Sequence, residues 1–163
     1  MGNRLVINFH GVGEPHAWVP RDELPYWCSE KDLLSLLDSI PEVSAQLQLP
    51  IAITFDDGNA SDLRITAPAM KHRGLSGSFF VCAGRLDMPG YLSSAQLNEL
   101  VAAGMTVGSH GWDHVDWRKL KRDDDLDREV VQARDRIADT LSSAVDSVAI
   151  PFGVALALNK FEC

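Results

Sequence analysis

Short apolar runs alternate along the chain with longer segments in which apolar residues recur every three or four positions. The short runs are four or five residues long and are bounded by glycine or polar residues, which is typical of buried strands. They cover residues 5–9, 51–55, 78–82, 105–108 and 147–150. Because helical segments alternate with these five predicted strands, the pattern predicts an α/β fold with a mostly parallel sheet and helices outside it.

The longer segments predict four helices. The first begins at a capping pattern formed by Ser29 and Asp32 and continues with a leucine stripe. The second contains Pro68, which is expected to kink it, and the third is closed by Gly104. The charged run at 121–125 is expected to be a solvated loop before the last helix. The four helical segments cover residues 29–37, 61–72, 94–103 and 126–141.

The composition is that of an ordinary globular protein, with 45% hydrophobic and 23% charged residues. A length of 163 residues predicts a single domain spanning 1–163. A net charge of -8 disfavours nucleic acid as a partner, because such binding needs a basic face, and also disfavours docking on an anionic membrane. No apolar run approaches the roughly 20 residues of a membrane span, so none is expected.

The first residues lead directly into an apolar strand, with no basic region followed by a long apolar segment. A signal peptide is therefore not expected, and the predicted location is the cytoplasm. The three cysteines, Cys28, Cys82 and Cys163, lie far apart and are odd in number. They predict free thiols rather than a disulfide framework.

Polar residues with catalytic potential follow several of the predicted strands directly. They are His10, the pair Asp56 and Asp57, and His110, and the segment 151–153 (Pro-Phe-Gly) follows the last strand. In parallel α/β folds, active sites are built at the carboxyl ends of the strands. The sequence therefore predicts that these residues meet at one edge of the sheet.

The segments 54–58 (TFDDG) and 110–114 (HGWDH) together indicate a metal-dependent hydrolase. A catalytic zinc takes three protein ligands and leaves one position for water, and an aspartate with two histidines suits it. His110 and His114 are four positions apart, so either a helical turn or a tight loop could bring their rings together. Asp56 and Asp57 would point in opposite directions on an extended chain, so that one could bind the metal while the other handles a proton.

Each of these features, taken singly, has an ordinary structural explanation. Asp-Asp-Gly is more often a turn, a pair of histidines four apart is common on a helix or loop surface, and His10 could be a core histidine. Their coincidence at matching strand ends favours the functional interpretation. The segment 59–61 (Asn-Ala-Ser) matches a glycosylation sequon, but beside a metal site we interpret it as chance.

With these motifs, the chain resembles the polysaccharide deacetylases, the NodB-homology carbohydrate esterases of family 4. Residues 54–58 look like the family's first motif, residues 109–114 like its second, and residues 151–153 like the core of its third. The resemblance covers most of residues 4–153. It implies a distorted (β/α) barrel with mostly parallel strands, here incomplete and shortened after about residue 153, because five predicted strands are too few to close it.

The resemblance also implies a role for each motif residue. Asp57, His110 and His114 would hold zinc or another divalent transition metal. Asp56 would be the general base and His10, in a rearranged strand order, the general acid. The substrate would be an acetylated carbohydrate, which loses an N- or O-acetyl group as acetate. Residues implied or expected to contact the sugar are Pro151, Phe152 and Trp112.

One departure from the family pattern leaves alternatives open. The third motif often carries an arginine that orients the catalytic aspartate, and that position is Ala149 here. One alternative is a shortened, inactive member that binds metal or glycan without turnover. Another is a hydrolase of cyclic amides or imides, which relatives of this fold cleave. An incomplete barrel also has open strand edges, which could support self-association.

Overall fold

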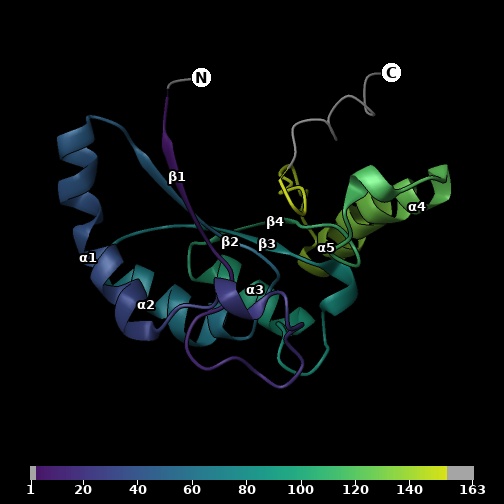
Figure 1. Cartoon of the computed structure of the whole chain (residues 1–163), viewed down its shortest axis with the longest axis horizontal. Coiled ribbons are helices and arrows are strands. Elements are labelled where there is room, and N and C mark those ends of the chain that lie inside the picture. The colour runs from purple at the N-terminus through teal and green to yellow at the C-terminus, as the bar shows by residue number, and fades with distance from the viewer. Residues whose placement is uncertain (1–2, 154–163) are drawn as a thin grey trace.

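Four parallel strands form the centre of the molecule, as the computed structural model of residues 3–153 shows (Figure 1). Their order in the sheet, β1-β2-β3-β4, follows the order in the chain. Within the described residues the sheet is open, with β1 and β4 at its edges, and the prediction of an incomplete, mostly parallel α/β structure is confirmed. The strands are β1 (Leu5–Phe9), β2 (Ile51–Phe55), β3 (Ser78–Val81) and β4 (Thr106–Ser109).

The fifth predicted strand, at 147–150, is reduced to a single bridge. Val148 lies beside Ser109 in parallel, and Ser109 donates its N–H to the Ser147 carbonyl at 3.0 Å. Pairing stops there because Pro151 has no N–H for a ladder and the backbone turns at Phe152, whose φ is +63°. The strand prediction was therefore wrong in extent, although the segment still lies at the carboxyl end of β4.

The predicted helices are all present, with altered limits. Pro68 lies in the first turn of α2, and a π-helical turn precedes it, because a proline inside the helix removes one regular hydrogen bond. Three acidic residues of the 121–125 run form the first turn of α4 rather than a loop, since helix amino termini favour negative charge. The elements are α1 (Glu30–Leu47), η2 (Asp62–Thr66, π), α2 (Ala67–His72), α3 (Ser94–Ala102), α4 (Asp123–Asp127), η5 (Arg128–Gln132, π) and α5 (Ala133–Leu141).

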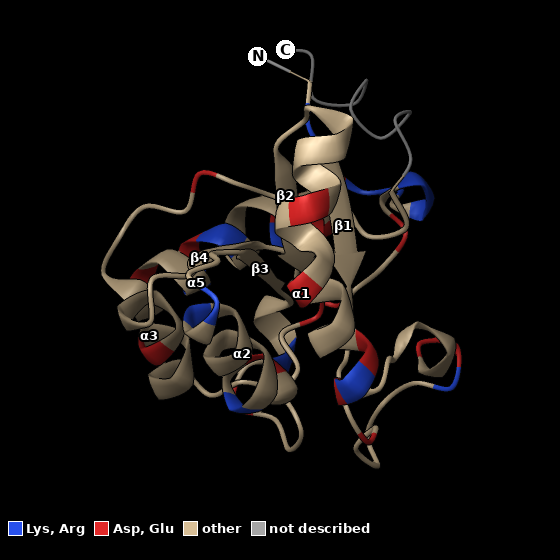
Figure 2. Cartoon of the chain, turned by 90° about the vertical axis from the view of Figure 1, so that its left-hand side faces the viewer, with Lys and Arg blue, Asp and Glu red and all other residues tan. Residues whose placement is uncertain are grey.

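Helices lie beside both edges of the sheet. In Figure 1, α1 and α2 lie at the β1 and β2 end, and α4 and α5 lie at the opposite end beside β4. Several positions along α1 are acidic, as the red segments of the ribbon in Figure 2 show, while Leu33, Leu37 and Ile40 are buried in the core. None of the helices in residues 3–153 is long and apolar enough to cross a membrane.

A row of stacked phenylalanines crosses three strands at the centre of the core. The ring of Phe55 on β2 is stacked at 5.2 Å on Phe9 of β1 and at 4.7 Å on Phe79 of β3. Phe55 and Phe79 are fully buried. Because Phe55 immediately precedes Asp56, the same packing that stabilises the sheet also fixes the position of the acidic pair.

We expect Phe55→Ala to lower the free energy of unfolding by about 3–5 kcal/mol, because it removes a fully buried ring and leaves a cavity. Urea denaturation followed by circular dichroism measures this loss. Val101→Ala, at an exposed position of α3, is the control and should change stability by less than about 0.5 kcal/mol. Equal stability of the two variants would contradict the central role of the phenylalanine row.

Candidate metal centre and catalytic pocket

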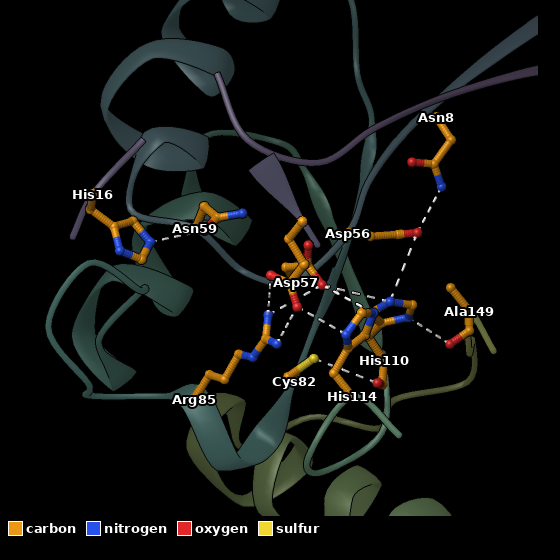
Figure 3. Close-up of polar contacts among 11 residues, drawn as sticks. Asn8, His16, Asp56, Asp57, Asn59, Cys82, Arg85, His110, His114 and Ala149 are labelled. Atoms are coloured by element: carbon orange, nitrogen blue, oxygen red, sulfur yellow. Dashed lines mark hydrogen bonds and ion pairs between the residues drawn. The ribbon is translucent and has the colours of Figure 1, made fainter. Parts of the chain in front are cut away.

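The carboxyl ends of the parallel strands bring the candidate residues together (Figure 3). Asp56 and Asp57 follow β2, His110 follows β4, and Arg85 ends a short 3-10 turn, Ala83–Arg85, after β3. His114 lies in the loop beyond His110 rather than on a helix, with φ at +55°. The tight loop, one of the two arrangements that the spacing allowed, is the one observed.

Asp57, His110 and His114 converge on one point. Asp57 Oδ1 lies 3.5 Å from His114 Nε2 and 3.8 Å from His110 Nε2. One ligand atom from each residue lies within 4.8 Å of the others, as a metal site requires. Asp57 Oδ1 and His110 Nε2 are buried and have no hydrogen-bond partner among the described residues. A carboxylate and two imidazoles that converge with buried atoms lacking hydrogen bonds form a donor set that fits a divalent cation such as zinc.

His110 is held in one orientation by the backbone. Its Nδ1 lies 2.8 Å from the carbonyl oxygen of Ala149. Burial lowers the pKa of His110 to about 4, so the ring is neutral near pH 7. A neutral ring that donates from Nδ1 keeps its lone pair on Nε2, the atom that faces Asp57.

His114 is held instead by a side chain. Its Nδ1 lies 3.0 Å from Glu23 Oε1, and Glu23 also forms a two-pronged ion pair with Arg85. Burial opposes ionisation of Glu23, but hydrogen bonds from His114 and Arg85 outweigh it and lower the pKa of Glu23 to about 2. Glu23 is therefore a carboxylate near neutral pH, and it completes an uninterrupted chain of polar contacts from Arg85 to His114.

Asp56 lies between Asn8 and the His110 edge of this cluster (Figure 3). The Asn8 amide donates to Asp56 Oδ2 at 2.7 Å, and the same oxygen lies 4.0 Å from His110 Nε2. Burial raises the pKa of Asp56, while the Asn8 hydrogen bond works in the opposite direction. The backbone separates the two carboxyls because Asp57 adopts φ of +77°, a left-handed conformation that a regular strand does not contain.

A cavity of about 560 Å³ opens onto this cluster. His10 lies in its wall with its ring stacked at 5.0 Å on Tyr26, and the Phe152 ring lies 5.0 Å from that of His114. Pro151 is buried and does not contribute to the wall. The lining residues are Asn8, His10, Asp22, Glu23, Tyr26, Asp56, His110, His114, Ala149, Ile150, Phe152 and Gly153.

Trp112, which the sequence suggested as a sugar contact, does not line this cavity. Its ring is half-buried, with the guanidinium groups of Arg128 and Arg136 over it at 5.2 and 5.3 Å. The ring also packs against Gly84, where an added Cβ would approach it to 2.7 Å. These contacts give Trp112 a packing role beside the site.

A buried carboxyl group supports the histidine loop from below. Glu129, in η5, accepts hydrogen bonds from the backbone N–H groups of Trp112 at 2.9 Å and Asp113 at 3.1 Å. It also accepts one from the indole of buried Trp117 at 3.4 Å. The sequence held a signal for this residue, because Glu129 is four positions from Ala133 on the stripe that faces the core.

Three further residues of the site were not predicted. Glu23 lies in a polar loop and Arg85 in a short turn, and neither belongs to a recognisable pattern. Asn8 is a polar residue in an apolar strand, which is a weak signal at best. Asn59 of the sequon at 59–61 has a packing role rather than that of a glycan acceptor, since its side chain is buried and its Oδ1 contacts His16 Nε2 at 3.2 Å.

Comparison with known proteins identifies the family. The model of the polysaccharide deacetylase family matches residues 46–159, and the chain therefore belongs to that family. Among curated proteins, YxkH of Bacillus subtilis (strain 168), whose name places it with the polysaccharide deacetylases, is 27% identical over 70 residues. That match covers 43% of this chain and 25% of YxkH, so the chain aligns with only a quarter of the length of that relative.

Solved structures show the same fold. The deacetylase PplD of Streptococcus pyogenes, solved with acetate, matches with a TM-score of 0.76 and 17% identity over 96% of this chain and 77% of PplD. IcaB from Ammonifex degensii matches with a TM-score of 0.73 and 24% identity over 95% of this chain and 77% of IcaB. At these identities the likeness establishes the fold alone.

We expect Glu129→Ala to lower the free energy of unfolding by about 3 kcal/mol, because two backbone N–H groups and an indole lose their buried acceptor. Glu129→Gln keeps one acceptor oxygen and should fall between this variant and the parent. Urea denaturation provides the measurement, with exposed Glu99→Ala as the control. A Glu129→Ala protein as stable as the control would show that the loop does not depend on this support.

Proposed function

We propose that the protein is a metal-dependent hydrolase that removes N- or O-acetyl groups from a carbohydrate. The observation that carries the proposal is the convergence of Asp57, His110 and His114 beside Asp56, with Asp56 and the two histidines in the wall of the cavity. Membership in the polysaccharide deacetylase family supports the same reaction and the same class of substrate.

The three converging residues would hold the cation through Asp57 Oδ1 and the two Nε2 atoms. When bound, a divalent ion such as zinc supplies Lewis acidity and lowers the pKa of water toward about 7. The protein fixes the orientation of both imidazoles, through the Ala149 carbonyl for His110 and through Glu23 for His114. The donor set is thus prepared before any ion arrives, which reduces the reorganisation that binding requires.

Asp56 is suited to be the general base. Its Oδ2 is held by Asn8, and its Oδ1 is buried with no hydrogen-bond partner among the described residues. That oxygen can accept a proton from the water that attacks the acetyl carbonyl carbon. The C–N or C–O bond to the sugar then breaks, and acetate and a free amine or hydroxyl are the products.

His10 is suited to protonate the departing nitrogen or oxygen of the sugar. It lines the same cavity as Asp56, and its stacking on Tyr26 fixes the plane of its ring. Tyr26 and Phe152 are exposed by 61% and 54% and offer aromatic faces to a sugar ring at the cavity. We assign the sugar contacts to these two residues rather than to Trp112 or to Pro151, which is buried and does not line the cavity.

Two substitutions separate metal binding from turnover. Asp57→Ala removes a ligand and should abolish stoichiometric zinc binding, measured by metal analysis of protein purified without affinity-tag metal. Asp56→Asn should keep one zinc per chain yet lower acetate release from acetylated amino-sugar oligomers by about 10²–10⁴-fold, because the proton acceptor is lost. Asp139→Ala, at an exposed position of α5, is the control for both measurements.

The outcomes distinguish the alternatives. A folded parent protein that takes up no zinc would favour the inactive family member that binds glycan without turnover. Zinc uptake with hydrolysis of cyclic imides but not of acetylated sugars would favour the cyclic amide reaction. An Asp56→Asn variant as active as the parent would remove Asp56 from the base role.

The role of His10 has its own test. His10→Ala should slow release of acetate from an N-acetylated sugar by about 10²-fold or more, because a poor leaving group needs a proton. Hydrolysis of 4-nitrophenyl acetate should change far less, since that leaving group departs unprotonated. His72→Ala, exposed on α2, is the control. Equal losses on both substrates would contradict the general-acid assignment.

A further inference from the structure

A buried ion pair lies directly behind the candidate metal ligands. Glu23 is 6% exposed, and Arg85 Nη1 lies 3.1 Å from its Oε2 while Nη2 contacts its Oε1. Arg85 Nη1 also lies 3.4 Å from Asp57 Oδ1, and its guanidinium lies over the ring of Tyr91 at 5.2 Å. The pair therefore touches two of the three candidate ligands, because Glu23 contacts His114 and Arg85 contacts Asp57.

We propose that Glu23 is a positioning residue that fixes the tautomer of His114, and that Arg85 holds Glu23 in place. The proposal rests on the metal-dependent function given above, and it adds a residue that lies in neither metal-binding motif. It also makes metal affinity depend on residues 10–29, the segment between β1 and α1, because this segment delivers Glu23 to the site.

The tautomer argument follows from the hydrogen-bonding capacity of each group. A carboxylate only accepts, so the contact between Glu23 Oε1 and His114 Nδ1 requires the proton to be on Nδ1. In the neutral ring Nε2 then carries the lone pair, and this atom lies 3.5 Å from Asp57 Oδ1. The rings of His110 and Phe152 are tilted against His114 at 5.0 Å, and such ring contacts do not select a tautomer.

The two histidines differ in what holds them. His110 donates to the backbone carbonyl of Ala149, which no substitution at that position removes. His114 depends on a side chain, so its anchor can be deleted. Loss of such an outer partner typically costs about 10- to 100-fold in metal affinity.

Arg85 makes this arrangement tolerable electrostatically. Glu23, Asp56 and Asp57 are all buried, and without a cation their mutual repulsion would oppose the cluster. Arg85 pairs with Glu23 and Asp57 at once, so it offsets the charge of the anchor and of a ligand together. The Arg85 contact with Asp57 is an ion pair at 3.4 Å, and Asp57 Oδ1, which also faces the histidines, has no hydrogen-bond partner among the described residues.

The anchored segment also forms part of the cavity wall. It leaves the sheet at His10 and returns through backbone hydrogen bonds between Gly11, Gly13 and Cys28. Between these points, Asp22, Glu23 and Tyr26 line the cavity. The contact between Glu23 and His114 therefore connects the candidate metal site to segment 10–29, which contributes His10 and Tyr26 to the cavity wall.

The test compares Glu23→Ala with Glu23→Gln in the full chain, with Glu14→Ala, exposed in the same segment, as the matched control. Zinc affinity is measured by competition with a chromophoric chelator. The tautomer of His114 is measured in metal-free protein from the ¹⁵N shifts of its ring, assigned with His114→Ala. Urea denaturation checks that each variant is folded.

We expect Glu23→Ala to bind zinc about 10- to 100-fold more weakly and to lose the Nδ1–H tautomer of His114. Glu23→Gln retains an acceptor oxygen and should keep the tautomer and most of the affinity. Glu14→Ala should match the parent in both measurements.

A folded Glu23→Ala protein with parental zinc affinity and an unchanged tautomer would overturn the proposal. Should Glu23→Ala not fold, Glu23→Met decides, because it keeps the length of the side chain but removes the carboxylate acceptor. Parental zinc affinity and an unchanged tautomer in that variant would equally overturn the proposal. The tautomer is read in metal-free protein, so it tests Glu23 even where the parent takes up no zinc. A parent that binds zinc without releasing acetate would contradict the proposed reaction and leave the role of Glu23 to these two measurements.

Discussion

The burial of three carboxyl groups beside two imidazoles is the constraint on which the rest of the site depends. Asp56, Asp57 and Glu23 are each at most 6% exposed, and buried charge is costly unless it is paired or binds a metal. Arg85 compensates Glu23 and Asp57 on one side, and Asn8 holds Asp56 on the other. Asp57 Oδ1 and His110 Nε2, which have no hydrogen-bond partner among residues 3–153, are the atoms that would face a cation.

The absence of an arginine at position 149 is accommodated by a change of partners. In the family pattern, an arginine there orients the catalytic aspartate. Here Ala149 contributes its carbonyl to His110, and the neutral amide of Asn8, from the neighbouring strand β1, takes the contact with Asp56. A neutral donor orients the carboxyl without adding charge, so burial is left as the main influence and raises the pKa of Asp56. That balance suits the base role proposed for Asp56.

Two interruptions of regular structure serve the site. The backbone at Asp57 takes a positive φ, and the two carboxyls, which both lie near His110, have different further partners, Asn8 for Asp56 and Arg85 for Asp57. The π-helical turn η5 contains the carboxyl group of Glu129, which holds the backbone of the histidine loop. Such features are costly locally, and the packed sheet below them, with Phe55 at its centre, supplies the rigid framework that maintains them.

The sequence by itself determined the parallel α/β fold and the convergence of Asp56, Asp57, His110 and His114, because apolar periodicity is local and parallel strands present their carboxyl ends at one edge. Only the tertiary structure decided the partners of those residues. Glu23 and Arg85 are 62 positions apart, and no local pattern relates them. No local pattern predicts the single bridge at Val148 or the packing of Trp112 beside the cavity either. Both follow from loop geometry, which depends on contacts between segments distant in sequence.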